Sequence, residues 1–458
     1  MKVIVCGAGQ VGYNIARTLA AEDNDVTIID NNEELVEKVA RTIEVQGVVG
    51  HASHPDVLER AGAMGAELMI AVTFADEVNM VACQVAHSLF EVPTKIARVR
   101  SQTYLDPAWA NLFSRDGLPI DITISPEIEV ARAIHRRLRM PGAFDMIPLA
   151  DDKVRLIGVR CEAECPIVNT PLRQLTGLFP DLNIVVVGIA RGTSAFAPTG
   201  DDVMLVGDEV YFVADAKHVN RALTLFGHNE AAHRRVVILG GGNIGLFLAE
   251  EIERAQGGVS AKIIEFDQKR AEFVAERLGN TVVLHGDALD SEILEEANID
   301  SAEAVLAVTN DDETNILASL LAKRAGCQRA VTLVNKSSYS SLVGSLGIDV
   351  VVSPRAITVS TILQHVRRGR IRSVHSLREG FGEIIEADAL ETSSLVNKPI
   401  RDAALPEGVI IGALVRGDQV EIPRPDTVPR VGDRVILFST YAAIKAVEKM
   451  FAVRLEYF

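Results

Sequence analysis

The same stretch of sequence occurs twice in this chain. Residues 3–16 read VIVCGAGQVGYNIA, and residues 236–249 read VVILGGGNIGLFLA. Each copy is a short apolar run, then Gly-x-Gly-x-x-Gly, then a segment whose apolar residues have helical spacing. A strand that passes through a glycine turn into a helix fits few architectures, and a chain that repeats it must repeat the surrounding unit too.

The repeat extends well beyond the glycines, and its order is the same in both halves. The matching pairs are AVTFADEVNMVA and AVTNDDETNILA (71–82, 307–318), TISPEI and VVSPRA (123–128, 351–356), and VGDEVYF and VGDRVIL (206–212, 431–437). The chain is therefore a tandem duplication, and each half holds a larger unit followed by a smaller one.

The larger unit alternates short runs rich in Val and Ile with amphipathic stretches. Continuously apolar runs are typical of strands buried on both faces, and their alternation with helices predicts an α/β, Rossmann-like parallel sheet. The smaller unit has a proline, a spacer and Gly-Asp before an apolar strand, which predicts a small α+β domain. In the first copy of the larger unit we expect strands near 2–6, 25–30, 45–49, 67–72, 95–99 and 121–124.

A further helix should leave each parallel sheet after a proline, Pro126 in the first half and Pro354 in the second. These signals set the expected domain limits. They are Rossmann domains at 1–124 and 233–352, crossover helices at 125–142 and 353–372, and small domains at 143–227 and 373–458.

Charge and hydropathy exclude several functions. The net charge of −16 argues against a general nucleic-acid binder and against direct docking on anionic lipid, because both need a basic face. No run of 18 apolar residues occurs, so we expect no direct membrane insertion. If the protein acts at a membrane, a partner must hold it there.

Both glycine motifs have the context of a nucleotide site, because each follows a strand and opens a helix. The first glycine allows a tight turn, the second lets the backbone approach a pyrophosphate, and the third allows close packing of helix and strand. The candidate loop residues are Gly7, Ala8, Gly9, Gln10, Val11 and Gly12 in the first copy, and Gly240, Gly241, Gly242, Asn243, Ile244 and Gly245 in the second.

An acidic residue should end the second strand and accept hydrogen bonds from a ribose. Asp30 ends DVTIID, and Glu265 ends AKIIE. A carboxylate at this place repels a 2′-phosphate, so NAD fits better than NADP, although Lys269 and Arg270 leave this open for the second site. An inherited fold whose sites hold no nucleotide is the alternative.

Other ligand contacts should come from the carboxyl ends of neighbouring strands. We expect Arg98 to pair with a phosphate. Its counterpart Leu333 cannot do so, and the second pocket should therefore rely on its backbone amides to bind a phosphate. His51, where the second copy has Asp287, is expected to cap a turn or face the ligand, and we predict no metal site. The remaining candidates are Thr73, Phe74, Thr309 and Asn310.

Nothing in the smaller units is typical of an active site. The units contain one histidine each, His218 and His375, and the two halves share no His, Cys or Lys that could be catalytic. They share a sheet, a glycine loop, an acid and an exit helix, which are parts for binding and movement. We therefore predict that the protein is not an enzyme, with an NAD-linked oxidoreductase as the alternative.

The order of Rossmann unit, crossover helix and small β-rich unit with its Gly-Asp turn resembles the RCK (KTN) family of regulators of potassium transport, over essentially all 458 residues. The resemblance implies NAD or NADH, and also ATP or ADP, as ligands. It implies a homotetramer that forms a ring of eight lobes, held at the cytoplasmic face of the inner membrane by a potassium channel or transporter subunit. An ancillary regulator of potassium efflux is a further alternative.

Two arginine-rich runs, IHRRLRMPG at 134–142 and HVRRGRIR at 365–372, lie where the crossover helices should end. Cations there complement the helix dipole. In so acidic a chain, they are also candidates for contacts between lobes or with a partner.

Overall fold

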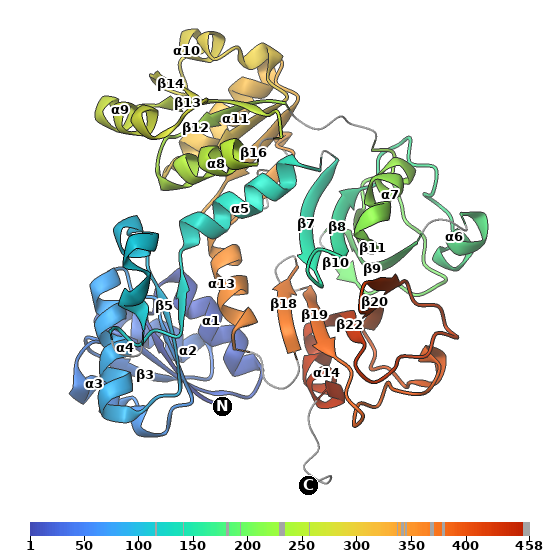
Figure 1. The fold of residues 1–458 in the computed structure, drawn as a ribbon, viewed down its shortest axis with the longest axis horizontal. Helices are drawn as coiled ribbons and strands as arrows, with labels where there is room; N and C mark the ends of the chain where they lie inside the picture. Colours follow the sequence, from blue (N-terminus) through green and yellow to red (C-terminus); the bar gives the residue numbers. More distant parts are fainter. Residues whose placement is uncertain are drawn as a thin grey trace.

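The computed structural model describes residues 1–451 except 115–116, 141, 180–182, 193, 229–233, 256, 337, 340–342, 344–345, 367–370 and 378–380. The described residues form two parallel six-stranded sheets and two antiparallel five-stranded sheets. Figure 1 shows two Rossmann lobes on one side of the molecule and two small domains on the other. The predicted fold class, a tandem duplication of these two kinds of domain, is confirmed.

The first lobe is a parallel sheet with strand order β3-β2-β1-β4-β5-β6. The expected strands are present, each within one or two residues of its predicted ends. They are β1 (Lys2–Cys6), β2 (Asp25–Asp30), β3 (Gln46–Val49), β4 (Leu68–Ala71), β5 (Thr94–Arg98) and β6 (Ile122–Ile124). The helices are α1 (Gln10–Ala21), α2 (Glu33–Thr42), α3 (Pro55–Arg60) and α4 (Asp76–Phe90).

The second lobe repeats this order as β14-β13-β12-β15-β16-β17. Its strands are β12 (Arg235–Leu239), β13 (Ser260–Glu265), β14 (Val282–His285), β15 (Ala304–Ala307), β16 (Arg329–Leu333) and β17 (Val350–Val352). Its helices are α8 (Asn243–Arg254), α9 (Gln268–Arg277), α10 (Ser291–Glu296) and α11 (Asp312–Arg324).

The central strand β1 explains why a continuous apolar run is needed. Ile4 and Cys6 belong to the core on one face of the sheet, and Val3 and Val5 belong to the core on the other. Because side chains alternate between the faces of a strand, burial of both faces by helices requires apolar residues at every position.

The small domains are antiparallel sheets with orders β10-β9-β11-β8-β7 and β18-β19-β22-β20-β21. The first contains β7 (Ala143–Leu149), β8 (Val154–Arg160), β9 (Ile184–Arg191), β10 (Ser194–Phe196), β11 (Glu209–Asp215), α6 (Leu172–Leu178) and α7 (Val219–Leu225). The second contains β18 (Ile371–Ser376), β19 (Gly382–Asp388), β20 (Val409–Arg416), β21 (Gln419–Glu421), β22 (Arg434–Thr440) and α14 (Ile444–Phe451). Short 3-10 helices complete the connections in both halves: η1 (Ala63–Gly65), η2 (Gln102–Leu105), η3 (Pro107–Phe113), η4 (Ala216–His218), η5 (Ile299–Ser301), η7 (Ile400–Asp402) and η8 (Tyr441–Ala443).

The repeated Gly-Asp turn of the small domains is held by an ion pair. Asp208 is buried and accepts two hydrogen bonds from the Arg191 guanidinium, at 2.9 and 2.7 Å. Asp433 is equally buried and is bound by Arg416 at 2.7 Å through both carboxylate oxygens. The aspartate thus ties the turn before β11 or β22 to the end of β9 or β20.

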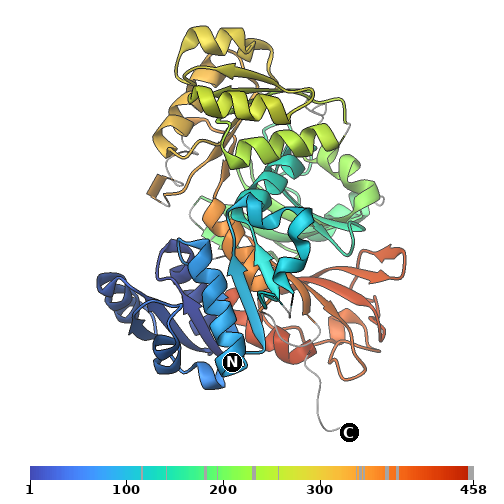
Figure 2. The same ribbon diagram turned by 60° about the vertical axis from the view of Figure 1, so that its left-hand side comes forward.

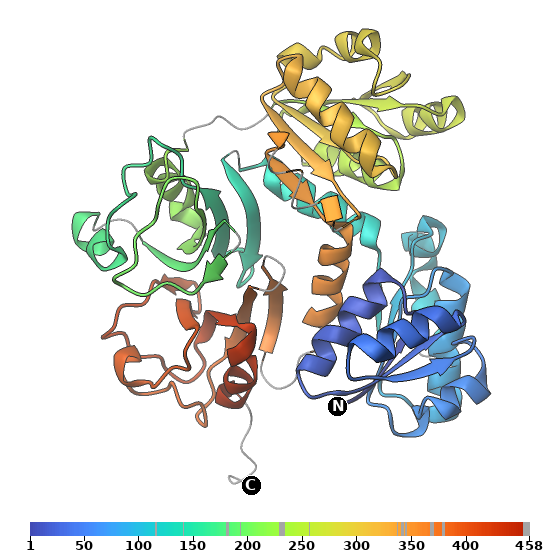
Figure 3. The ribbon, with the colours of Figure 1, turned by 180° about the vertical axis from the view of Figure 1, so that it is seen from behind.

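The crossover helices α5 (Pro126–Leu138) and α13 (Pro354–Gln364) are exchanged between the halves. α5 packs on α8 of the second lobe, α13 packs on α1 of the first lobe, and the two crossover helices pack on each other. Figure 1 shows α5 beneath the second lobe and α13 beside α1, and Figures 2 and 3 show the same crossing from other sides. Val130 and Ile134 of α5 lie in the core of the second lobe, and Ile362 and Leu363 of α13 lie in that of the first.

The two small domains also share a core. Phe381, which precedes β19, packs against Tyr211 of β11 and Phe438 of β22. A Cβ on Gly188 of β9 would lie 2.6 Å from the Phe381 ring, so that glycine admits the aromatic side chain. Each half of the chain is therefore completed by the other half.

The contacts predicted for the arginine-rich runs involve Arg136, Arg137 and Arg139 in the first half and Arg367, Arg368 and Arg370 in the second. Arg137 does not face outward, because it pairs with Asp145 at 2.6 Å, donates to the carbonyl of Phe144 and keeps only 14% of its side chain exposed. Arg139 is exposed. Arg136 is partly buried, and the three arginines of the second half lie outside the described residues.

Within the described ranges, no helix combines the length and the apolar character needed to cross a membrane.

Candidate nucleotide-binding pockets

Two glycines in each loop occupy positions where the fold leaves no room for a side chain. Gly7 and Gly240 have φ of +109° and +104°, a region that favours glycine. A Cβ on Gly12 would overlap the carbonyl oxygen of Gly7, and one on Gly245 would overlap that of Gly240. The first and third glycines of both motifs are thus required by the turn and by the close approach of the helix.

The middle glycine of each motif is not required by the backbone, and its position instead suits a bound ligand. Gly9 and Gly242 are the N-caps of α1 and α8, and nothing lies within 4 Å of a Cβ built on either residue. Their φ angles of −65° and −60° would suit any residue. Open space before a helix N-terminus is the cradle that a phosphate group needs, so the residues fit a bound nucleotide.

The predicted acids lie beside the glycine loops in both lobes. One Asp30 oxygen accepts the backbone N–H of Ala8 at 2.6 Å, and the other accepts that of Asn32 at 2.9 Å. Glu265 repeats this with the N–H groups of Gly241 (2.6 Å) and Asp267 (2.9 Å). Each carboxylate is thereby fixed at the edge of the loop, where a ribose would lie.

A buried asparagine braces each pocket and is missing from our sequence candidates. Asn79 accepts the N–H and the hydroxyl of Thr73 at 2.8 and 2.7 Å and donates to the carbonyl of Arg98 at 2.9 Å. Asn315 binds Thr309 at 2.9 and 2.7 Å and donates to the carbonyl of Leu333 at 3.1 Å. The signal was present, because both asparagines match in the repeated AVT segment.

A second brace from the same helices was missed as well. Asp76 at the start of α4 accepts the N–H groups of Arg100 and Ser101 at 2.9 and 2.8 Å. Asp312 at the start of α11 accepts those of Asn335 and Lys336, both at 2.8 Å. The loops that follow β5 and β16 are therefore held in the same way.

Arg98 lies where the sequence predicts a phosphate partner. Its Nη2 donates to the carbonyl of Thr73 at 2.7 Å, while its buried Nε has no hydrogen-bond partner among the described residues. Burial, followed by the nearby charge of Arg100, lowers the pKa of the Arg98 guanidinium. A buried cation with an unused donor is stabilised by an anion, so its setting suits a phosphate.

The residues that follow β4 and β15 differ between the lobes. Phe74 is 84% exposed, and its ring lies 5.7 Å from the Cζ atom of Arg100. Its counterpart Asn310 is also exposed but is not aromatic. An apolar ring this exposed, beside Arg100, can cover one end of a ligand in the first pocket only.

The loops after β3 and β14 are less directly involved. His51 is exposed and lies against His54, with ring centroids 5.2 Å apart. Asp287 caps its own turn by accepting the N–H of Leu289 at 2.9 Å. The role of His51 at the ligand stays a prediction.

The expectation that the second pocket has only backbone amides is corrected. Leu333 is buried and belongs to the core of the second lobe, so it cannot face a ligand. A cation from another element lies at the second glycine loop. Arg270 of α9 donates to the carbonyl of Gly241 at 2.7 Å and to Asn243 Oδ1 at 3.2 Å. Arg98 and Arg270 therefore approach the two pockets from different places in the fold.

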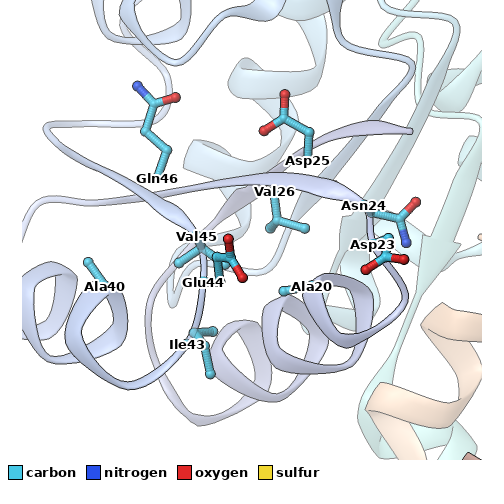
Figure 4. Close-up of a pocket in the computed structure, with 10 residues that line it drawn as sticks. All are labelled: Ala20, Asp23, Asn24, Asp25, Val26, Ala40, Ile43, Glu44, Val45 and Gln46. Carbon is cyan, nitrogen blue, oxygen red and sulfur yellow. The ribbon is translucent and has the colours of Figure 1, made fainter. Parts of the chain in front are cut away.

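A hollow of about 560 Å³ lies at the opposite edge of the first sheet. Figure 4 shows Asp25 and Val26 at the start of β2, with Asp23 after α1 and Glu44 before β3. These residues mark the amino ends of the strands, whereas the glycine loop and Asp30 lie at the carboxyl ends. The hollow is therefore separate from the candidate pocket.

Comparison with known proteins identifies both kinds of domain. The TrkA-N domain family matches residues 3–126 and 236–354, and the TrkA-C domain family matches residues 156–227 and 384–452. The chain is 53% identical to the Trk system potassium uptake protein TrkA of Azorhizobium caulinodans over the full length of both proteins. It is 42% identical to the TrkA protein of Halomonas elongata, again over the full length of both.

Solved structures share the fold over nearly the whole chain. The GsuK RCK domain aligns with a TM-score of 0.60 at 20% identity and covers 99% of this chain and 95% of that one. The GsuK channel bound to NAD aligns with the same score and identity and covers 99% of this chain and 79% of that one. With its two TrkA-N and two TrkA-C domains, the chain therefore belongs to the Trk system potassium uptake protein TrkA family.

Proposed function

We propose that this chain is the nucleotide-binding regulatory subunit of a membrane potassium uptake system. Its full-length relatives are named as Trk system potassium uptake proteins, and a solved structure of similar fold is a channel bound to NAD. The duplicated pockets supply two places where a nucleotide can act. The subunit then alters the channel through a ligand-dependent rearrangement of its lobes.

The contact between the first pocket and the other half of the chain carries this proposal. Gln10 belongs to the first glycine motif and opens α1, and its Oε1 accepts a hydrogen bond from Arg355 of α13 at 3.1 Å. The same two helices pack along their apolar faces. A ligand at the first loop therefore acts directly on the helix that leads to the second small domain.

The free energy of such a switch comes from differential binding. A ligand shifts an equilibrium between two lobe arrangements only by its preference for one of them, and a tenfold preference corresponds to about 1.4 kcal/mol. NAD or NADH fits the loop and the acid of the first pocket, and ATP or ADP shares their adenosine and phosphate groups. Several equivalent pockets in an oligomer add their effects.

We further propose that four chains form a ring of eight lobes beneath a TrkH/TrkG-like channel subunit, at the cytoplasmic face of the inner membrane. Exposed apolar side chains support an interface between lobes: Val81 and Leu89 on α4 and Leu317 on α11. Exposed apolar residues that recur on one helix of both lobes are suited to contacts between copies.

The test is potassium flux through vesicles that contain the membrane partner and the full-length subunit. Gly9→Asp and Gly242→Asp each place a carboxylate in an open phosphate cradle, so each should close one pocket without disturbing the fold. Gly177→Asp is the matched control, because Gly177 also faces open space but lies in a small domain.

We expect nucleotides to change potassium flux with the wild-type and Gly177→Asp subunits, and the double variant Gly9→Asp/Gly242→Asp to lose the response. If nucleotides do not change potassium flux with the wild-type subunit, the proposal is contradicted. Turnover of NADH with a carbonyl substrate would instead favour an oxidoreductase.

A further inference from the structure

The second glycine loop is contacted by a cation from its own lobe, Arg270, whereas the first loop is contacted through Gln10 by Arg355 of α13, from the other half of the chain. Arg270 donates to the carbonyl of Gly241, and Glu265 accepts the N–H of the same residue, so the two charged side chains hold the two peptide groups that flank the Gly241 Cα. The residue at the same place in α2 is Leu35, an apolar residue packed against the core of the first lobe.

Local structure fixes the position of Arg270. Asp267 caps α9 by accepting the backbone N–H of Arg270 at 2.8 Å. The Arg270 guanidinium lies 4.9 Å from the centroid of the Phe273 ring, a distance at which a cation is attracted to an aromatic face. Burial lowers the pKa of this guanidinium, and the charge of Glu265 opposes that effect. The side chain is therefore a partly buried cation beside the loop.

The two pockets place their cations over opposite ends of a ligand. In a Rossmann sheet the ribose of the adenosine lies at the acid after the second strand, and the pyrophosphate lies at the glycine loop. Arg270 follows β13 and its Glu265, so it lies on the adenosine side. Arg98 ends β5, which lies on the other side of the glycine loop in the strand order.

The exposed aromatic residues follow the same division. Phe266 comes directly after Glu265, is 73% exposed and corresponds to Asn31 in the first lobe. Phe74, on the side of Arg98, corresponds to Asn310 in the second lobe. The first pocket thus has its cation and ring beyond the pyrophosphate, and the second has both at the adenosine.

Resting on the proposed function, we infer that Arg270 and Phe266 make the second pocket a site for the adenosine-phosphate half of a nucleotide, so that adenine mononucleotides bind there as well as dinucleotides do. Arg270 pairs with the phosphate next to the ribose, and Phe266 offers its ring to the base. The first pocket instead distinguishes ligands by the group beyond the first phosphate.

The test uses full-length Gly9→Asp protein, in which only the second pocket is open, and calorimetric titration with AMP, ADP and NAD. We expect the three dissociation constants to agree within about threefold. Arg270→Ala in this background should weaken all three ligands by about tenfold or more, as expected for loss of a charged hydrogen bond. Arg277→Ala is the matched control, since Arg277 lies on the same helix over the same ring, at 4.6 Å.

Three results would overturn the inference. They are NAD binding at least tenfold more tightly than AMP, an Arg270→Ala variant with unchanged affinity, and a Gly9→Asp protein that binds no nucleotide. The Gly242→Asp protein separates this failure from failure of the proposed function. If it still binds NAD, only the second pocket is reassigned, whereas absence of binding in both variants and the wild type contradicts nucleotide regulation itself.

Discussion

The two Rossmann lobes are alike in their backbone and different in the side chains that surround the ligand space. Both have the glycine turn, an acid bound to the loop, and an asparagine that ties the strand ends together. They differ in where the cation and the aromatic ring lie, which is Arg98 and Phe74 in one lobe and Arg270 and Phe266 in the other. Duplication has kept the parts that build a pocket and changed the parts that select what enters it.

This difference shows which substitutions should affect both lobes equally and which should separate them. Substitutions of residues that the glycine turn requires should have equal effects in the two lobes, because each lobe folds around the same backbone turn. Substitutions of residues that lie at the ligand should have different effects in the two lobes, because these residues differ between the pockets.

The largest expected effect is on the third glycine of each motif. Gly12→Val and Gly245→Val each force a side chain into the carbonyl oxygen of the first glycine. We expect each to lower the free energy of unfolding by about 3 kcal/mol or more, since neither the turn nor the helix can move freely. Denaturant unfolding measured by circular dichroism checks this.

The middle glycines provide the control for that experiment. Gly9→Ser and Gly242→Ser introduce a side chain into open space at a helix N-cap, where serine is well tolerated. The free energy of unfolding should then change by no more than about 0.5 kcal/mol. A loss as large as that of the valine variants would mean that the loops are more crowded than the structure shows.

The Gly-Asp turns of the small domains should also behave as equivalents. Asp208→Ala and Asp433→Ala each remove a buried carboxylate that an arginine binds, and we expect each to cost about 2 kcal/mol of unfolding free energy, because the arginine left behind is partly exposed. Urea titration of the two variants checks both the size and the equality of the losses. Asp152→Asn, which removes the charge of an exposed carboxylate paired with Arg155 and suits the φ of +62° at this position, should cost less than about 1 kcal/mol.

The same pairs predict a pH dependence. Burial tends to raise the pKa of Asp208 and Asp433, but the arginine hydrogen bonds outweigh it, so that the pKa of each carboxyl is lowered. Stability from these pairs is therefore present above the ordinary carboxyl pKa of about 4 and is lost as the pH falls below it. In the alanine variants, the slope of stability against pH in this acid range should be smaller.

The sequence predicts the frame of the molecule well, because the frame depends on local patterns. Continuous apolar runs mark strands buried on both faces, and the proline at Pro126 marks the start of α5 within the repeat. The exchange of the crossover helices could not be predicted in this way. Nothing in the pattern of Val130 and Ile134 says whose core these residues enter.

The sequence predicts the pockets less completely, for a similar reason. Glycines and acids at fixed spacing reveal a loop and a ribose position, but Arg270 reaches the loop from a helix start 29 residues later. Matching Arg98 to Leu333 assumes that a function stays at one position after duplication. In this chain the cation occurs at a different element, which only the three-dimensional arrangement reveals.

A smaller effect should separate the pockets by their cations. Arg98→Ala should weaken nucleotide binding by about 1.5–3 kcal/mol in a Gly242→Asp background, the usual range for a charged hydrogen bond. Leu333→Ala is not a suitable control, because Leu333 is buried and its truncation would cost stability. Arg41→Ala serves instead, since Arg41 is exposed on α2 and paired with Glu37, and calorimetry should show unchanged affinity. Equal weakening by both substitutions would remove Arg98 from the pocket.

The smallest expected effect concerns the 2′-phosphate that distinguishes NADP from NAD. Asp30 lies at the first loop without a cation at the place of Arg270, so like-charge repulsion should favour NAD by about 1.4 kcal/mol, a tenfold preference. Asp30→Asn, which keeps the shape and removes the charge, should narrow the preference to about threefold. In the second pocket Arg270 lies beside Glu265 and offsets its charge, so wild-type discrimination there should already be weak. Competition titrations in the Gly242→Asp and Gly9→Asp proteins measure each pocket alone. If the second pocket rejects NADP as strongly as the first, the Arg270 charge does not reach the ribose, and the contrast between the lobes is confined to Arg98 and the exposed rings.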